Sequence, residues 1–351
     1  MEIRGVWLPN TDSLVLTSQQ RITEAMEFLA EMGFNVVFPV VWSKGYTVYP
    51  SQVMGKLFGV EIDPRYQGRD PLGEVIEAAK RVEIAVIPWF EYGFASSYNQ
   101  NGGHLLAKKP DWAACDRKGN LLKKNNFEWL NAFHPEVQDF LLNLILEVVT
   151  NYDVTGIQGD DRLPALPSEG GYDFYTVSCY RKQFKCSPPY NHKNEKWLQW
   201  RSDLLTDFLA RIYCQVKAID PNLLISIAPS IYDWGFKEYL QDAKTWVDKG
   251  LVDLIHPQLY RRDFHSYKSL VDRLVNWQLN TEQLSLLAPG ILLNLGSSYR
   301  IDPNYLLSAI AYNRHCGITG EIFFFYEGLR KDNHALAKIL RNGPYAKFAN
   351  S

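Results

Sequence analysis

Eight short apolar runs recur along the chain, and segments with helical periodicity separate them. Buried parallel strands have continuous apolar runs of this kind. We predict strands at residues 3–8, 35–41, 84–89, a fourth ending at Asp160, 224–228, 252–259, 284–291 and 321–326. We predict helices at about residues 17–32, from 70–71 onward, 135–150, 196–219, 236–248, 267–279, 303–313 and 334–340. Such an alternation predicts parallel strands joined by right-handed crossovers.

The simplest fold for this pattern is an α/β fold of the closed type, a (β/α)8 TIM barrel. An open doubly wound sheet is the alternative, and it is less favoured because no Gly-x-Gly-x-x-Gly follows the first strand. Three connections are long, at residues 42–69, 90–134 and 162–195, after strands two, three and four. We expect them to wall one side of the top face. Without a linker or an internal repeat, residues 1–351 are predicted to form a single TIM-barrel domain.

Composition narrows the possible partners. Hydrophobic residues make up 46% of the 351 residues, which allows a large core. The net charge is −2 and no basic cluster recurs on a helical face, which argues against nucleic acid and anionic membrane as partners. Aromatic residues reach 14%, a level common in proteins that stack sugar rings, although a generous aromatic core explains it equally well.

The termini and cysteines carry little signal. The five cysteines are odd in number and include no Cys-x-x-Cys, so the sequence predicts neither a disulfide framework nor a zinc knuckle. No apolar run approaches the roughly 20 residues of a transmembrane helix, and no signal peptide is visible. The chain as given would be cytoplasmic, but a trimmed export signal would leave the same sequence, so localisation stays open. No protein partner is implied.

Acidic residues follow several of the predicted strands. The fourth run stops at Asp160 and Asp161, followed by Arg162. In a TIM barrel the downstream ends of the strands carry the active site. The two-residue period of a strand places Asp160 on the same face as Gln158. The sequence therefore predicts a site at this end of the fourth strand.

Four acids are the candidate catalytic residues: Glu91, Asp160, Asp161 and Glu327. Cleavage of a glycosidic bond requires one acid to protonate the leaving oxygen and a second carboxylate as nucleophile or base. We assign the second role to Asp160 and the first to Glu91, whose apolar approach would raise its pKa. Asp161 and Glu327 are substitutes. Structural roles compete: Asp161 could pair with Arg162, Glu91 could cap its loop, and Glu327 could face solvent.

Aromatic, amide, imidazole and guanidinium side chains follow the same strand ends. Those expected to bind a sugar are Trp7, Asn10, Trp42, Trp89, Tyr92, Gln158, Arg162, His256, Gln258, Tyr260 and Tyr326. Other chemistries fit less well. The seven histidines are scattered, which argues against a metal site, and no strand offers an interior lysine for a Schiff base. We therefore expect neither a metal nor a cofactor.

Five motifs carry a resemblance to a known family. They are Arg4-Gly5-Val6-Trp7-Leu8, Asn131-Ala132-Phe133-His134-Pro135, the run from Tyr152 to Asp161, Trp200-Arg201, and His256-Pro257-Gln258-Leu259-Tyr260. Together they resemble glycosyl-hydrolase-like family ten over about residues 2–330. The resemblance implies a TIM barrel, glycoside hydrolase activity, and further substrate contacts from Asn131, His134 and Arg201.

The chain departs from the usual family motif at the fourth strand. The family commonly has Asp-Gly-Ile-His-Phe-Asp-Asp-Tyr, whereas this chain has Thr155, Gln158 and Arg162 in place of the first acid, the histidine and the tyrosine. Asp160 and Asp161 are retained. At least one bacterial member is understood to cut peptidoglycan glycan strands that lack stem peptides, and the substitutions leave this chain's substrate open.

The sequence thus predicts a glycoside hydrolase that acts on a bacterial polysaccharide or oligosaccharide, with a peptidoglycan-type glycan as one candidate. Two alternatives remain: a barrel that binds glycans without cleaving them, and a lyase or transglycosylase that uses the same acids. We expect Trp42, Trp89 and Tyr260 to line the bowl. We also expect Glu91 and Asp160 to face each other across about 5–5.5 Å for retention or roughly 6.5–9.5 Å for inversion.

Overall fold

Parallel strands form the centre of the computed structural model, which describes residues 2–347. One sheet has the order β13-β16-β1-β2-β5 and the other β12-β11-β10-β6. Their bounds are β1 (Arg4–Leu8), β2 (Val36–Pro39), β5 (Ala85–Val86), β6 (Trp89–Phe90), β10 (Gly156–Gly159), β11 (Leu224–Ile227), β12 (Leu254–Ile255), β13 (Gly290–Leu292) and β16 (Glu321–Phe324). Every pairing between these strands is parallel.

Isolated parallel bridges connect the two sheets. Val40, just past β2, pairs with Trp89 of β6, while Gln258 pairs with Gly290 of β13. The strands therefore follow one another around a common axis in chain order, and the predicted TIM-barrel fold is confirmed. The predicted third strand is split, because β5 continues the β2 pairing and β6 joins β10.

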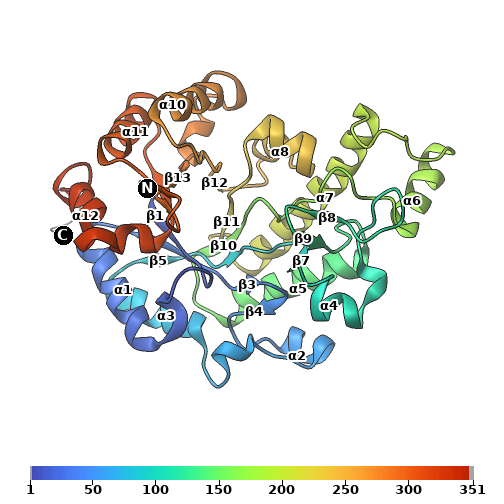
Figure 1. Ribbon diagram of the computed structural model, residues 1–351, viewed down its shortest axis with the longest axis horizontal. Coiled ribbons are helices and arrows are strands. Elements are labelled where there is room, and N and C mark those ends of the chain that lie inside the picture. The colour runs from blue at the N-terminus through green and yellow to red at the C-terminus, as the bar shows by residue number, and fades with distance from the viewer. Residues whose placement is uncertain (1, 348–351) are drawn as a thin grey trace.

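Helices surround the strands, as Figure 1 shows. Their bounds are α1 (Gln19–Glu31), α3 (Pro71–Arg81), α5 (Pro135–Asn151), α7 (Glu195–Ile219), α8 (Tyr232–Tyr239), α9 (Ala243–Asp248), α10 (Phe264–Arg273), α11 (Pro303–His315) and α12 (Tyr326–Asn342). The helix predicted from 70–71 is present, and the Asp70 side chain accepts a hydrogen bond from the Gly73 amide at its first turn.

Two predicted helical segments differ in detail from the structure. The segment predicted as one helix at 236–248 forms α8 and α9, which are separated at Leu240 in the left-handed conformation. Asp242 then accepts a hydrogen bond from the Thr245 amide and starts α9. The helix predicted at 334–340 is present as the second part of α12, because residues 331–334 are non-helical and separate it from a shorter helical stretch that begins at Tyr326. Both differences place helix N-termini closer to the strand ends.

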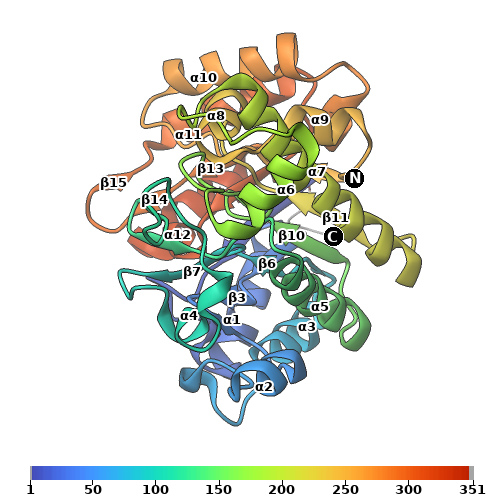
Figure 2. The same ribbon diagram turned by 90° about the vertical axis from the view of Figure 1, so that its right-hand side faces the viewer.

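The three long connections contain structure of their own. The first holds β3 (Trp42–Ser43), β4 (Tyr46–Thr47) and α2 (Gln52–Phe58). The second holds β7 (Ala95–Tyr98), α4 (Gly103–Lys108), β8 (Lys123–Lys124) and β9 (Phe127–Trp129), and the third holds α6 (Phe174–Phe184). Figure 1 shows α4, α6 and β7–β9 extending from one side of the barrel. Seen from that side, α6 lies above α4 (Figure 2). A further hairpin, β14 (Asn294–Leu295) and β15 (Tyr299–Arg300), follows β13.

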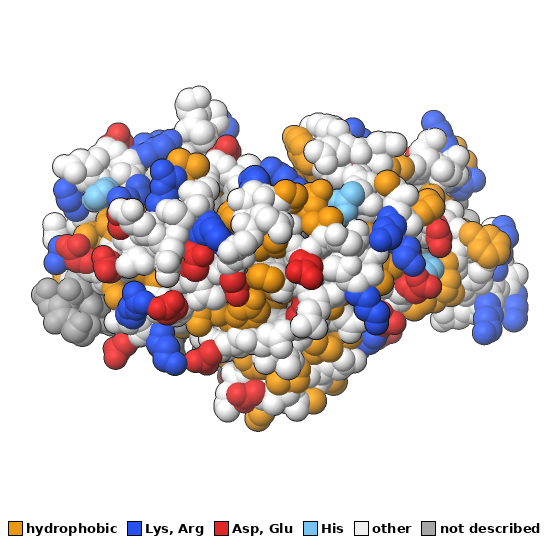
Figure 3. Space-filling model, turned by 90° about the horizontal axis from the view of Figure 1, so that it is seen from below, with side chains coloured by type: hydrophobic (Ala, Val, Ile, Leu, Met, Phe, Trp, Pro, Cys, Tyr) orange, Lys and Arg blue, Asp and Glu red, His pale blue; other side chains and the backbone are white. Residues whose placement is uncertain are grey.

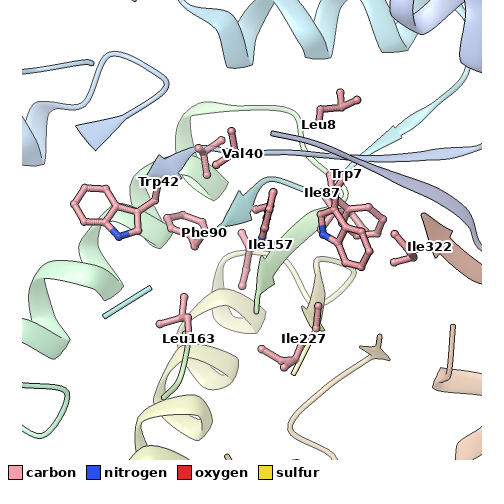
Figure 4. Packing of buried hydrophobic residues seen from close by; sticks show 14 of the residues in the cluster. Trp7, Leu8, Val40, Trp42, Ile87, Phe90, Ile157, Leu163, Ile227 and Ile322 are labelled. Carbon is pink, nitrogen blue, oxygen red and sulfur yellow. The ribbon is translucent and has the colours of Figure 1, made fainter. Parts of the chain in front are cut away.

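The interior of the barrel is filled by large apolar side chains. Figure 4 shows Trp7 among the strands with Ile157, Ile227 and Ile322 near it, whereas Trp42 lies apart from this group. All four of these side chains are no more than 2% exposed, and Ile157 and Ile227, which alternate with the inward-facing Gln158 and Ser226, lie on the outer face of the strands. Trp7 also donates its indole N–H to the Gln158 side chain at 2.6 Å, so the interior is apolar with a few satisfied polar groups.

The surface has no strongly segregated charge on the face in Figure 3, where acidic and basic side chains are interspersed. No helix within residues 2–347 is long and apolar enough to cross a membrane. All five cysteines have free thiols.

Candidate active site

The predicted acids after β6 and β10 lie together. The two strands pair in parallel with Gly159 opposite Phe90, so the residues that follow them leave the barrel side by side. Glu91 follows β6 at once, and Asp160 follows β10. Both are therefore carried by the ends of rigid, buried strands at the top face, where TIM barrels place their active sites.

Two glycines let the chain fold back at this point. A Cβ at Gly93, which has φ of +47°, would lie 2.1 Å from the Arg162 carbonyl oxygen. A Cβ at Gly159 would lie 2.3 Å from the carbonyl oxygen of Leu163. Both positions require glycine because the segment after Asp160 passes directly over them. The Phe94 amide then donates to the Arg162 carbonyl at 3.0 Å, which joins the two loops.

Asp160 is buried and held by three donors. Its Oδ1 accepts from the backbone amide of Arg162 at 2.9 Å. Its Oδ2 accepts from the Trp89 indole at 3.1 Å and from the Arg162 Nη2 at 2.9 Å. Burial raises the pKa of Asp160, and the guanidinium of Arg162 opposes that rise. Because Asp160 is only 1% exposed, its carboxyl group lies beneath the surface of the site.

Arg162 contacts all three acids of this region. Besides Asp160, its Nη1 lies 3.0 Å from Asp161 Oδ1 and its Nη2 lies 4.0 Å from Glu91 Oε1. Because Nη2 is 2.9 Å from Asp160 Oδ2, Glu91 Oε1 and Asp160 Oδ2 can be separated by at most the sum of the two distances, about 6.9 Å. Three carboxylates thus share one guanidinium, and we name them with Arg162 the acid cluster.

Glu91 has the surroundings expected of a proton donor. Burial raises its pKa, and the neighbouring guanidinium of Arg162 only partly offsets this effect. Its Oε2 is buried without a well-aligned hydrogen bond within residues 2–347, and the nearby Ser43 hydroxyl also opposes the rise in the pKa of Glu91. A carboxyl group whose charged form is disfavoured keeps its proton to a higher pH, which is the property that general acid catalysis requires.

Asp161 is the member of the acid cluster that lines a cavity. The cavity measures about 480 Å³, and its lining includes Ser230, Gln258 and Tyr260 from the ends of the next two strands. The Asp161 side chain is 28% exposed, the highest value among the three acids. Asp161 is therefore the acid of the three that is most accessible from this cavity. A larger hollow of about 800 Å³ lies among residues 50–70, away from the acid cluster.

Several predicted binding residues lie beneath this cavity. Trp7, Trp89 and Tyr260 surround Phe324, with ring centroids 5.3–6.5 Å from it. Gln158 is fully buried and links Trp7 to Ser226. Of the three aromatic residues predicted to line the bowl, Tyr260 lines the cavity, whereas Trp89 is 3% exposed and supports Asp160 from below.

His256 and Tyr92 also serve as supports of the site. The His256 ring is fully buried beside Phe38, and its Nδ1 lies 2.8 Å from the Ala288 carbonyl oxygen. Burial lowers the pKa of His256 to about 4. Tyr92 is 4% exposed and packs against Phe127, and the guanidinium of Arg162 lies near both rings. Neither side chain has the exposure that contact with a sugar requires.

Other predicted residues are not brought to the acid cluster. Trp42 is fully buried, donates to the Gly93 carbonyl and packs on Phe140 of α5. Tyr326 packs on Phe28 of α1, and Glu327 accepts a hydrogen bond from Ser13. The β3–β4 hairpin and the early start of α12 explain these positions, because both turn the chain away from the barrel axis directly after a strand.

The three residues implied by the family resemblance hold the long third connection. Arg201 is fully buried on α7 and donates to the carbonyl oxygens of Ser168, Gly170 and His192. Asn131 donates to Thr176 of α6. His134 packs beside the ring of Tyr175, also on α6. Their contacts are with α6 and its flanking segments, and none of the three lines the cavity next to Asp161.

The sequence reasoning missed five residues that line the cavity: Ile231, Asp233, Trp234, Leu270 and Arg273. Trp234 is 50% exposed and offers an open aromatic face on α8. The signal in the sequence is the run Ile231-Tyr232-Asp233-Trp234, which lies between strand five and the helix predicted at 236–248. The early start of α8 brings this run over the cavity.

Several of the buried polar atoms that lack a well-aligned hydrogen bond lie at neighbouring strand ends. Among residues 2–347 these are both amide atoms of Asn10, the Ser43 hydroxyl and Glu91 Oε2, which interact with each other, and Asp161 Oδ1, whose partner is the guanidinium of Arg162. These residues follow the first four barrel strands in order. Buried polar groups are normally satisfied, so such a row marks where a polar ligand or water would bind.

No group of three or more His, Cys, Asp or Glu side chains within residues 2–347 is arranged to hold a metal ion.

In sequence, the chain is similar to glycosyl hydrolases. The family model described as glycosyl hydrolase-like 10 matches residues 2–304. Glycosyl hydrolase DigH of Escherichia coli K12 is 23% identical over 333 residues, covering 87% of this chain and 73% of that protein. Glycosyl hydrolase YngK of Bacillus subtilis 168 is 24% identical over 398 residues, covering 99% of this chain and 72% of that protein.

Solved structures share the fold. The PgaB (BpsB) glycoside hydrolase domain of Bordetella bronchiseptica superposes with a TM-score of 0.72 at 12% identity, covering 97% of this chain and 99% of that one. The catalytic domain of a β-amylase from Paenibacillus polymyxa gives 0.66 at 10% identity, covering 98% of each chain. At these identities the likeness shows the barrel fold alone.

Proposed function

The chain belongs to the glycosyl hydrolase-like 10 family, and from the acid cluster we propose that it is a glycosidase. It would cleave a bacterial polysaccharide or oligosaccharide, with a peptidoglycan-type glycan as the first candidate. The observation that supports this proposal is the cluster of three carboxylates around the single guanidinium of Arg162, with incompletely hydrogen-bonded polar side chains at the adjacent strand ends. A sugar, with its many hydroxyl groups, would satisfy such side chains.

We assign the acid to Glu91 and the second carboxylate to Asp161. The raised pKa of Glu91 suits a donor of a proton to the leaving oxygen. Asp161 lines the cavity, and its Oδ1 lies 3.0 Å from the Nη1 of Arg162, which would hold the carboxylate in place. Asp160, which the sequence favoured for this second role, would instead fix Arg162 and Trp89 in place.

Asp160 remains the rival for the second role. Its Oδ2 lies at most about 6.9 Å from Glu91 Oε1, which spans the separation of about 5–5.5 Å for retention and the lower end of the 6.5–9.5 Å range for inversion. Its near-complete burial argues for a supporting role, since a nucleophile or base must reach the sugar or a water molecule.

A glycan-binding barrel without catalysis is the second candidate function. The observation that favours it is the position of Arg162, which ion-pairs with every acid of the cluster. A guanidinium stabilises the ionised form of a carboxyl group beside it. The carboxylate is then a weaker base, and less of the protonated form is present to donate a proton. The two candidates differ in what happens when one acid is removed.

The deciding experiment supplies purified protein with peptidoglycan glycan strands stripped of stem peptides and with chitin oligosaccharides, and measures new reducing ends. A glycosidase should produce them, and Asp161→Asn should abolish them while binding is kept. Binding without any product would establish the binding barrel. Products that end in an unsaturated or anhydro sugar would identify a lyase or transglycosylase. Loss of activity in Asp160→Asn alone would return the second role to Asp160.

A further inference from the structure

The cavity next to Asp161 contains two arginines in different electrostatic states. Arg273 of α10 forms an ion pair with Asp233 of α8, and both line the cavity. Arg261, which lines the same cavity, forms no ion pair within residues 2–347. The Arg261 guanidinium therefore has no carboxylate partner within 4.0 Å among the described residues, although Asp161 lines the same cavity.

The backbone around Arg261 is held firmly. The hydroxyl groups of Tyr299 and Tyr305 donate to its carbonyl oxygen at 3.3 and 3.2 Å. The Nη1 of Arg261 donates to the neutral carbonyl of Tyr260 at 2.8 Å. A guanidinium has five N–H donors, so most of them remain for a ligand. An arginine on a fixed backbone that lines a cavity is suited to recognising an anion.

The neighbouring acids limit which anion can bind. Arginine pairs in a bidentate manner with both carboxylates and phosphates. Asp161 lines the same cavity and repels a dianion more strongly than a singly charged group. Ser230, Gln258 and the exposed indole of Trp234 complete a lining suited to a sugar ring. A ring that carries one carboxylate matches all of these features.

We propose that the sugar unit bound in this cavity carries a carboxylate and that Arg261 recognises it. The inference rests on the proposed function and specifies its substrate class as an acidic glycan. The carboxylate could belong to a lactyl ether, as on muramic acid, or to a uronic acid. Arg261 would then discriminate between acidic and neutral glycans, while the acid cluster performs the cleavage.

The test compares matched ligands on matched variants. The ligands are a lactyl-bearing glycan oligosaccharide, a uronate-containing oligosaccharide, the carboxamide form of each, and a neutral N-acetylglucosamine oligosaccharide. The variants are the wild type, Arg261→Gln and Arg262→Gln. Arg262 is the control because it is exposed, carries the same charge one residue away and does not line the cavity. Affinity is measured by calorimetry, with thermal melting to check folding.

The wild type should bind one carboxylate form about tenfold more tightly than its carboxamide, the order of a charge-assisted hydrogen bond. Arg261→Gln should lose this preference and Arg262→Gln should keep it. The preferred acid, lactyl or uronate, identifies the source of the carboxylate. Equal affinity for carboxylate and carboxamide in the wild type, or a preference that survives in Arg261→Gln, would overturn the inference.

Failure of the proposed function would look different. In that case no oligosaccharide, acidic or neutral, would bind or be cleaved by any of the three proteins. Binding and cleavage of neutral chitin-type oligosaccharides with no preference for an acid would keep the glycosidase and reject the role of Arg261. Tighter binding of a phosphorylated oligosaccharide than of both carboxylates would likewise reject it.

Discussion

Two buried clusters of arginine and acid lie at opposite ends of the barrel, and they are built differently. At the bottom, Glu321 starts β16, and each of its oxygens is bonded: Arg314 donates to both at 2.8 and 3.0 Å, and Tyr345 donates to one at 2.6 Å. At the top, Arg162 is shared by three acids, and Glu91 Oε2 has no well-aligned hydrogen bond.

The difference is the one expected between a structural ion pair and the proposed catalytic site. A buried charge that is fully hydrogen-bonded gains nothing from a ligand. A cluster with surplus carboxylates and open hydrogen-bonding capacity is destabilised until a ligand arrives, as active sites commonly are. TIM barrels divide their ends in this way, with stability at the bottom and chemistry at the top.

The largest expected effect is on turnover at the top cluster. Glu91→Gln and Asp161→Asn should each lower turnover by about 10²–10⁴-fold, because a positioned proton donor or base contributes that much. Release of reducing ends from an accepted glycan measures this. Thermal stability at neutral pH should stay level or rise in Glu91→Gln, since burial raises the pKa of Glu91 and disfavours its ionised form. Turnover near the wild-type value in both variants would remove the acids from the mechanism.

At the bottom cluster we expect the opposite: a loss of stability with no loss of turnover. Glu321→Ala removes the buried carboxylate that accepts from Arg314 and Tyr345, leaves Arg314 with Glu2 as its remaining acidic partner, and should lower the free energy of unfolding by about 1–3 kcal/mol. Glu31→Ala breaks the exposed pair with Arg341 and should cost at most about 1 kcal/mol. Urea unfolding measures both. Turnover of folded Glu321→Ala should stay unchanged; a loss comparable to that of the top variants would show that the two ends are not separate.

His256 should make the barrel sensitive to acid. Its pKa is lowered from 6.5 to about 4, so the unfolded chain takes up the proton before the folded chain does. The resulting stability is fully present above pH 6.5 and is lost as pH falls through about 4, a difference of about 3 kcal/mol. His256→Gln should show a flatter decrease in unfolding free energy across this range. An unchanged slope would mean that the His256 site admits the charged ring.

The smallest effect is expected at an exposed aromatic side chain. Trp234→Ala removes the open indole beside the acid cluster and should weaken glycan affinity by about 1 kcal/mol. Trp277, which is 59% exposed and does not line the Asp161 cavity, is the matched control. Trp277→Ala should leave affinity unchanged. Equal losses in both variants would point to a general effect of surface aromatics rather than to a sugar platform.

The sequence was sufficient for the fold and for the position of the acids. Continuous apolar runs marked all eight strands, and the acids that end strands three and four meet because β6 and β10 are neighbours. Which acid faces the cavity did not follow from strand periodicity. The chain turns over Gly159 right after the strand, and this turn buries Asp160 while Asp161 reaches the cavity.

Other roles depended on partners that are distant in sequence. Trp42 follows strand two as expected, but the β3–β4 hairpin carries its ring to Phe140 of α5. Arg201 binds backbone carbonyl groups, which leave no mark in residue identities. Trp234 was hidden by a helix boundary placed four residues too late.

The buried Arg201 has a consequence for how this protein can vary. By bonding to Ser168, Gly170 and His192, it ties the two ends of the segment that holds α6 to each other and to α7. A loop whose ends are fixed in this way can change length at little entropic cost, because closure depends only weakly on loop length. Insertions and deletions between residues 171 and 191 should therefore leave Asp160 and Asp161 undisturbed, so relatives could acquire different outer walls around the same carboxylates.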